Sequence, residues 1–386
     1  MGLREDYLYW RFTYFFIVEK KYRILNISPD HQEIWLENTK NKKYPVIRLK
    51  RMDIDWSNWL QRDLERTNVN GEKIRKALYK RSLEIVNIYI SSFPPVDSYE
   101  QLLREQYDTK KIILQTFLVE GSNIEQTLKP INNKFGEQII HEIKEHYDPL
   151  EVEQWKSHAL NFAVHEAKKE KQLFQSGKPF FTYALLVVQC VIFLLLEISG
   201  GSTNPYVLLQ FGAKYNPLIL EGEWWRFFTP MFLHIGFLHL FMNSLALYYL
   251  GTAVERIFGN WRFLLIYFFA GFSGSLGSFL FSPNLSAGAS GAIFGCFGAL
   301  LFFGLVHPKV FQRTLGINIL VVLALNLLFG FSVSSVDNAG HIGGLIGGFL
   351  AAGFIQLPKN RRLGQQSLFL LLAILIVGAS LWLGFY

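Results

Sequence analysis

Long apolar stretches separated by short polar segments dominate the second half of the chain. Seven of these stretches approach the roughly 20 residues that a helix needs to cross a bilayer. The uncharged run 263–306 is too long for one crossing, and Pro283 and Asn284 supply a turn that divides it. We therefore predict seven membrane helices, near residues 180–198, 235–254, 262–281, 288–306, 314–333, 339–357 and 367–385.

The first part of the chain has shorter and more polar patterns. "QEIWLEN", "YPVIRLK" and "LEIVNIYI" alternate apolar and polar residues as half-buried strands do, and residues 55–83 have a charged helical character. The composition changes near Lys178 and Pro179. We predict a soluble α/β or α+β domain followed by an α-helical polytopic membrane domain. The expected parts are a soluble cytosolic domain (1–175), a six-helix core (179–357) and a seventh, C-terminal transmembrane helix (367–386).

The distribution of charge supports this division. Residues 1–178 hold 29 of the 38 Lys and Arg and 26 of the 31 Asp and Glu, so the net charge of +7 reflects no strongly basic domain. We expect no nucleic-acid partner. Charges at the N-terminus lead us to expect no cleavable signal peptide. Cys190 and Cys296 both fall inside apolar segments, where we expect packing residues and no disulfide framework.

Basic residues predict the orientation of the helices, because cytoplasmic loops are enriched in Lys and Arg. Such residues precede the first helix and lie between the second and third, the fourth and fifth, and the sixth and seventh. They are Lys168, Lys169, Lys171, Lys178, Arg256, Arg262, Lys309, Arg313, Lys359, Arg361 and Arg362. We therefore expect a multi-pass protein of the cell membrane with a cytosolic N-terminal domain. Helices two, four and six then run from outside to inside.

Four polar side chains lie near the predicted outer ends of these three helices. His239 and Asn243 share one face of the second helix, Ser290 begins the fourth, and His341 begins the sixth. Ionisable or polar groups in hydrocarbon are costly and by default indicate a functional site. Because the three helices run the same way, the four groups are expected to share one depth in the outer leaflet.

Small residues on two of these helices permit a close approach of their backbones. The glycines of the fourth segment are Gly288, Gly291, Gly295 and Gly298, and those of the sixth are Gly340, Gly343, Gly344, Gly347 and Gly348. Such packing would bring an imidazole within the ~2.6–3.2 Å of a serine oxygen that a base and nucleophile require. We expect His341 to lie next to Ser290.

These residue types predict acyl-transfer chemistry. Ser290 would be the nucleophile and His341 the general base. His239, the Asn243 amide and the Ser290 backbone N–H would stabilise the oxyanion, where loss of one donor costs roughly 3–4 kcal/mol. The nearest carboxylate, Asp337, lies just outside the sixth helix, so we expect a dyad and no triad.

Other interpretations remain open at this point. Taken singly, Ser290 could bond its own backbone, the His and Asn residues could join helices, and the glycines could serve packing alone. Two other functions are a catalytically inactive membrane protein that binds and escorts client proteins, and a transporter, although matched repeats or interrupted helices are not evident. The shared depth of the polar groups favours catalysis.

With these residues placed, residues 179–386 resemble the rhomboid intramembrane serine proteases. "EWWRFFTP" resembles the Trp-Arg motif of the first external loop, with structural residues Trp225 and Arg226. "HLFMN" matches the His-x-x-x-Asn motif, "GASG" the Gly-x-Ser-Gly motif and "GHIGG" the Gly-His motif with its following glycines. The resemblance implies a Ser290–His341 dyad, His239 and Asn243 as oxyanion partners, and structural roles for Gly288, Gly291, Phe294 and Gly344.

The soluble N-terminal domain and the seventh helix resemble most the Bacillus-type rhomboids. Those proteins carry a further C-terminal soluble domain, whereas this sequence ends at Tyr386 with its last helix. Phe294 stands where relatives can carry tyrosine, so a ring could stack on His341 but no phenol is present.

The resemblance implies transmembrane protein substrates that enter from the bilayer, with small residues preferred at the cleavage site, and no cofactor. The substrate's identity and the oligomeric state cannot be read from the sequence. His141, Glu145, His146, His158 and His165 have helix-compatible spacings that could hold a divalent metal. No short motif fixes a ligand geometry, so we expect a solvated helix face and no metal site.

Overall fold

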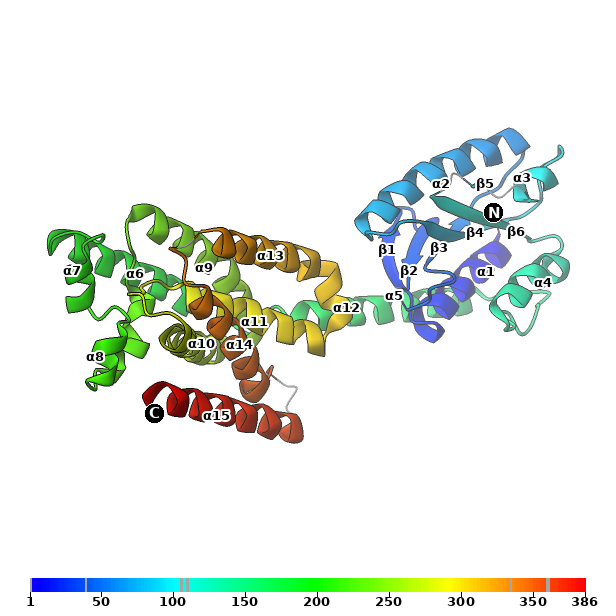
Figure 1. Ribbon diagram of the computed structural model, residues 1–386. Helices are drawn as coiled ribbons and strands as arrows, with labels where there is room; N and C mark the ends of the chain where they lie inside the picture. The colour runs from blue at the N-terminus through cyan, green and yellow to red at the C-terminus, as the bar shows by residue number, and fades with distance from the viewer. Residues whose placement is uncertain (1, 39, 105–106, 109–110, 334, 359–361) are drawn as a thin grey trace. The chain divides into compact units, whose positions relative to one another are not determined.

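The computed structural model describes residues 2–38, 40–104, 107–108, 111–333, 335–358 and 362–386. Lys359 and Arg361, used above to orient the helices, lie outside these described residues. The chain divides into two compact units, Met1–Lys169 and Glu170–Tyr386 (Figure 1). Each unit is described by itself.

The first unit contains a six-stranded mixed sheet in the order β1-β2-β3-β4-β6-β5 (Figure 1). The pairs β1–β2, β2–β3 and β5–β6 are antiparallel, whereas β3–β4 and β4–β6 are parallel. The strands are β1 (Arg23–Ile27), β2 (Glu33–Glu37), β3 (Val46–Arg51), β4 (Leu83–Ser91), β5 (Tyr107–Asp108) and β6 (Ile112–Glu120). The helices are α1 (Leu3–Tyr14) with the π-helical turn η1 (Phe15–Glu19), α2 (Ser57–Ala77), α3 (Glu100–Arg104), α4 (Ile124–Phe135) and α5 (Pro149–Gln172).

Alternating side chains cover both faces of this sheet. Ile47 and Leu49 of β3 belong to a buried cluster with α1, α4 and α5, whereas Val46 of the same strand belongs to a second cluster with α2. Successive strand residues point to opposite faces, so two helical layers need apolar residues at both sets of positions. The predicted α/β character of this region is confirmed.

The second unit is helical and contains the seven predicted apolar helices. Six are long and apolar enough to cross a membrane, and α11 is a shorter apolar helix. The seven are α6 (Phe181–Ile198), α9 (Phe237–Phe258), α10 (Asn260–Phe281), α11 (Ser290–Val306), α13 (Ile317–Ser332), α14 (Asn338–Ile355) and α15 (Leu363–Phe385). Short helical turns fill the connections: α7 (Pro205–Gln210), α8 (Asn216–Leu220), η2 (Trp224–Phe227), η3 (Thr229–Phe232), α12 (Pro308–Phe311) and η4 (Gln312–Gly316).

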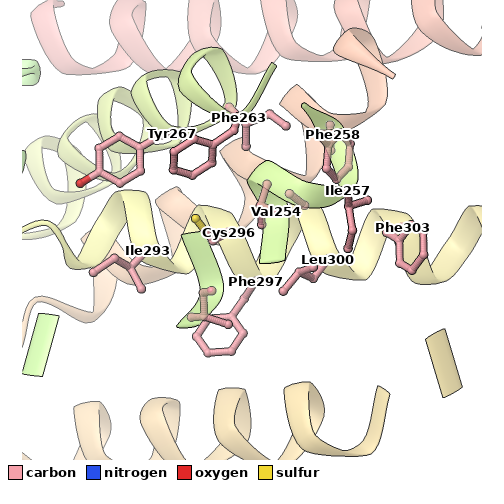
Figure 2. Close-up of a cluster of buried hydrophobic side chains, with 14 of the residues drawn as sticks. Val254, Ile257, Phe258, Phe263, Tyr267, Ile293, Cys296, Phe297, Leu300 and Phe303 are labelled. Atoms are coloured by element: carbon pink, nitrogen blue, oxygen red, sulfur yellow. The ribbon is translucent and has the colours of Figure 1, made fainter. Parts of the chain in front are cut away.

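The core of this unit lies between α9, α10, α11 and α14. Figure 2 shows side chains of α9, α10 and α11 packed together, among them Phe258, Tyr267 and Phe297. Helix α11 is buried along most of its length, so little of its surface is left to contact lipid. By contrast, α15 buries little of its surface, so its apolar side chains suit contact with lipid.

A fully buried carboxylate joins α6 to the end of α9. Glu255 accepts hydrogen bonds from the backbone N–H groups of Phe180, Phe181 and Thr182, each at 2.9 Å. These donors lie in the first turn of α6, where N–H groups lack intrahelical acceptors. The negative charge also favours the positive end of the helix dipole. Glu255 therefore fixes where the first membrane helix begins.

Two sequence-based expectations are wrong in detail. Gly288 lies before α11, which begins at Ser290, and so is not part of the helical glycine face. Residues 136–148 are not helical, because Gly136 ends α4 with a left-handed conformation (φ +70°) and α5 begins only at Pro149. Helix-compatible spacing therefore does not apply to His141, Glu145 and His146.

Candidate active site

Ser290 and His341 lie side by side at the N-terminal ends of α11 and α14. Nε2 of His341 is 2.9 Å from Oγ of Ser290, within hydrogen-bond distance. Ser290 is the first residue of its helix, so its backbone N–H is among the groups without an intrahelical acceptor. A nucleophile, a base and a free N–H thus meet at one point.

Phe294 and Ser290 contact the His341 ring, and Asp337 caps the helix that carries it. Phe294, one turn after Ser290, stacks on the imidazole with ring centroids 4.1 Å apart and an angle of 11° between the rings. Asp337 caps α14 by accepting a hydrogen bond from the Gly340 N–H (2.9 Å). Nδ1 of His341 is buried and has no hydrogen-bond partner among the described residues. The ring position therefore depends on stacking and on the Ser290 contact.

His239 and Asn243 lie on α9. The Ile235 N–H donates to Nδ1 of His239 (3.3 Å), so a neutral His239 carries its proton on Nε2. One Asn243 amide N–H donates to the His239 carbonyl oxygen (3.0 Å). Its second amide hydrogen is not used by that bond.

Gly288 brings His239 near the serine. A Cβ at this position would lie 2.9 Å from Nε2 of His239 and 3.7 Å from Oγ of Ser290. Its φ of +146° also disfavours side chains. Nε2 of His239 and Oγ of Ser290 therefore border the same small space, which only glycine leaves open.

The backbones of α11 and α14 are in direct contact. A Cβ on Gly344 would lie 1.9 Å from the Gly291 carbonyl oxygen, and one on Gly348 would lie 2.1 Å from the Gly295 carbonyl oxygen. A Cβ on Gly291 would approach the Gly340 carbonyl oxygen to 3.4 Å. This spacing sets the distance between the helices that carry Ser290 and His341.

The Trp-Arg pair lies in the loop between α6 and α9. Arg226 is buried, pairs with Glu223 and donates hydrogen bonds to the carbonyl oxygens of Leu209 (3.0 Å) and Ala213 (2.8 Å). Trp225 is partly exposed, and its carbonyl oxygen accepts a hydrogen bond from the Thr229 hydroxyl. Arg226 thus organises the loop, while the Trp225 ring faces outward.

Sequence reasoning missed two buried polar residues near this site. His234 is fully buried, with its ring 5.4 Å from the His239 ring. Burial and the nearby His239 lower the pKa of His234 to about 3, so the ring is neutral. The sequence contains a signal for His234, because it is a second histidine beside His239 in the apolar run "FLHIGFLHL". Lys214, also fully buried, is the other residue.

A cavity of about 30 Å³ adjoins Ser290, with room for about one water molecule. Its lining includes Gly288, Ser275, Ser286 and Asp337. Among the described residues, no group of three or more His, Cys, Asp and Glu could hold a metal ion. His141, Glu145, His146, His158 and His165 are all exposed.

Comparison with known proteins identifies relatives of this chain. The Rhomboid domain model matches residues 221–359. The chain is 41% identical over 382 residues to Rhomboid protease GluP of Bacillus subtilis, covering 99% of this chain and 75% of that protein. It is 36% identical to Putative rhomboid protease YdcA of B. subtilis (50% and 96% covered) and 30% identical to Rhomboid protease AarA of Providencia stuartii (55% and 84% covered).

The chain therefore belongs to the rhomboid family. It is a multi-pass membrane protein and an intramembrane serine protease, which confirms the predicted fold, enzyme class and family. The expected likeness to a Bacillus rhomboid is also confirmed.

Proposed function

We propose that Ser290 and His341 are the catalytic dyad of this protease. The observation that carries the proposal is the 2.9 Å contact between Oγ of Ser290 and Nε2 of His341. Oγ attacks the scissile carbonyl carbon while its proton passes to Nε2. The tetrahedral intermediate then expels the amine, which takes that proton, and leaves an acyl-enzyme. Water, deprotonated by His341, hydrolyses the ester and regenerates Ser290.

His239, Asn243 and the Ser290 backbone N–H are proposed to stabilise the oxyanion. The Nε2 proton of His239 is directed toward the space beside Gly288, and the Ser290 N–H lies at the positive end of α11. Donors fixed before the reaction need no reorganisation as charge develops. Gly288 keeps this space open, Gly291 and Gly344 keep α11 against α14, and Phe294 holds the His341 ring.

The proposed substrates are membrane proteins that bring a transmembrane segment to this site from the bilayer. Ser290 begins a helix that is buried within the bundle, so a substrate must leave its own helical conformation to place a carbonyl beside Oγ. Segments with helix-weakening residues such as glycine and serine unwind at lower cost. We propose that the reaction needs no cofactor. We also propose that residues 1–175 form a soluble domain, residues 179–357 the protease core and residues 367–386 an additional helix.

A single-span substrate reconstituted with the protein tests this function. We expect cleavage within or near the transmembrane segment, next to small residues, with fragment masses determined by mass spectrometry. A matched substrate with leucines in place of glycine and serine at the cut site should be cleaved more slowly, because its helix unwinds less readily. Cleavage only in a distant soluble loop, with equal rates for both substrates, would refute the proposed substrate class.

The active site is proposed to open toward the outside of the cell membrane, opposite to a cytosolic N-terminal domain. The basic loops described above support this orientation. In a Cys190→Ala background, which removes an exposed thiol, an impermeant thiol reagent on whole cells should label a cysteine at Asn284 and spare one at Lys309. Asn284 precedes α11 and Lys309 follows it, and both are exposed. The reverse labelling pattern would overturn the orientation.

A further inference from the structure

Lys214 is a fully buried lysine in the loop between α7 and α8. Its Nζ donates hydrogen bonds to the carbonyl oxygens of Ser282 (2.5 Å) and Asn284 (3.1 Å). Its backbone also exchanges both hydrogen bonds with Ser286, at 2.9 and 3.0 Å. Lys214 therefore contacts three residues of the segment that leads from α10 toward Ser290, and the Asn216 amide adds a bond to the end of α10.

The carbonyl oxygens around Nζ explain why a buried cation is tolerated here. Ser282 directly follows α10, and the last carbonyls of a helix lack intrahelical donors and carry partial negative charge. Burial lowers the pKa of Lys214 to about 8, while the Asp337 carboxylate acts in the opposite direction. Among the described residues no carboxylate lies within ion-pair distance of Nζ, so carbonyl oxygens are its direct partners. A side chain without an N–H donor would remove the hydrogen bond to the Asn284 carbonyl oxygen and leave the Ser282 carbonyl oxygen with only the longer bond (3.4 Å) from the Asn216 amide.

The loop that carries Lys214 is itself anchored. Arg226 donates to the carbonyl oxygen of Ala213 (2.8 Å), and the Thr229 hydroxyl donates to that of Gly212 (2.5 Å). The two residues immediately before Lys214 are thus fixed to η2 and η3. The ammonium group extends from a rigid support.

The segment that Lys214 contacts continues directly to Ser290. Ser286 lies two residues before Gly288, whose N–H donates to the Pro230 carbonyl oxygen (2.9 Å). Ser286, Gly288, Ser290 and Asp337 all line the small cavity beside the site. A shift of residues 282–288 would therefore move Gly288 and the start of α11 relative to His239 and His341.

We propose that Lys214 is a positioning residue of the nucleophile, whose ammonium group holds residues 282–288 so that Ser290 meets His341 and the oxyanion donors in productive geometry. This inference rests on the proposed function of Ser290 and His341. Lys214 touches no reacting atom. Its effect is expected in kcat, because a misplacement of about 1 Å costs on the order of 10²-fold in rate.

Two variants separate the charge from the volume of this side chain. Lys214→Met keeps an unbranched side chain as far as Cε without the ammonium group and is expected to lower kcat on the order of 10²-fold with KM nearly unchanged. Lys214→Ala leaves space that propylammonium can fill, since this cation supplies the atoms beyond Cβ. Propylammonium should restore activity to Lys214→Ala, whereas propan-1-ol, of similar size and uncharged, should not. Lys171→Ala, at an exposed lysine, should show neither defect nor response.

Each result of these experiments either supports the positioning role of Lys214 or overturns it. Wild-type kcat in a folded Lys214→Met protein would overturn the proposal, as would equal effects of propylammonium and propan-1-ol on Lys214→Ala, including no effect of either. If Lys214→Met fails to fold, the comparison of the two additives on Lys214→Ala decides alone. Full activity of Ser290→Ala would instead refute the proposed dyad, so failure of the inference is distinguishable from failure of the function.

Discussion

Alanine at Ser290 or at His341 is expected to lower cleavage of a transmembrane substrate by at least about 10³-fold. The Ser290 variant lacks the attacking oxygen, and the His341 variant lacks the group 2.9 Å away that accepts its proton. Ser290→Ala removes one hydroxyl, so thermal unfolding in detergent should remain close to that of the wild type; His341→Ala also loses the stacking on Phe294, so its melting temperature should be measured beside its activity. Cleavage in proteoliposomes, followed by gel electrophoresis, measures the loss.

Matched controls are available for both residues. Ser332→Ala and His307→Ala change the same residue types, at the end of α13 and after the end of α11. Both should retain near-normal activity. The proposed dyad acts as a unit, so we expect the double variant to be little worse than either single one. Near-normal cleavage by either single variant would contradict the dyad.

Leucine at Gly344 is expected to reduce stability and activity together. Its Cβ would lie 1.9 Å from the Gly291 carbonyl oxygen, a backbone atom that no rotamer change can move aside. The helices α11 and α14 would have to separate, which overpacking data place at about 3 kcal/mol or more for so large a side chain. Separation would also break the contact between Ser290 and His341. Apparent melting temperature and cleavage rate should fall in the same variant.

Gly378→Leu is the appropriate control. Gly378 lies on α15, and a Cβ there would meet no atom within 4 Å. This variant should melt and cleave like the wild type. If Gly344→Leu did the same, the close approach of α11 and α14 at this point would not be what holds the site together.

The membrane helices could be predicted from the sequence because their signal is local. A long apolar run needs no partner to be recognised, and the uncharged run 263–306 divides at Pro283 as expected. The sheet order β1-β2-β3-β4-β6-β5 depends on contacts between distant segments, which periodicity does not contain. The first helix, Leu3–Tyr14, was missed because its polar residues Glu5 and Arg11 are buried in the fold.

The site was predictable where a polar group stood out from apolar surroundings. Ser290, His341, His239 and Asn243 were identified in this way, and the structure brings Ser290 to His341 and His239. Lys214 was missed because a lysine in a loop is ordinarily solvated, and only the folded chain shows that Nζ reaches the end of α10. Gly288 was assigned to a helix because its positive φ is set by the Pro230 contact, which no spacing indicates.

The most direct test of the dyad is covalent labelling with a serine-directed fluorophosphonate in detergent. A nucleophilic Oγ displaces fluoride from phosphorus, so the wild type should be labelled, and the modified peptide should contain Ser290. Ser290→Ala should show no labelling, and His341→Ala should be labelled far more slowly, because its serine lacks the base at 2.9 Å. Labelling of Ser290→Ala at the wild-type rate, or attachment to a different serine in the wild type, would contradict the assignment of Ser290 as nucleophile.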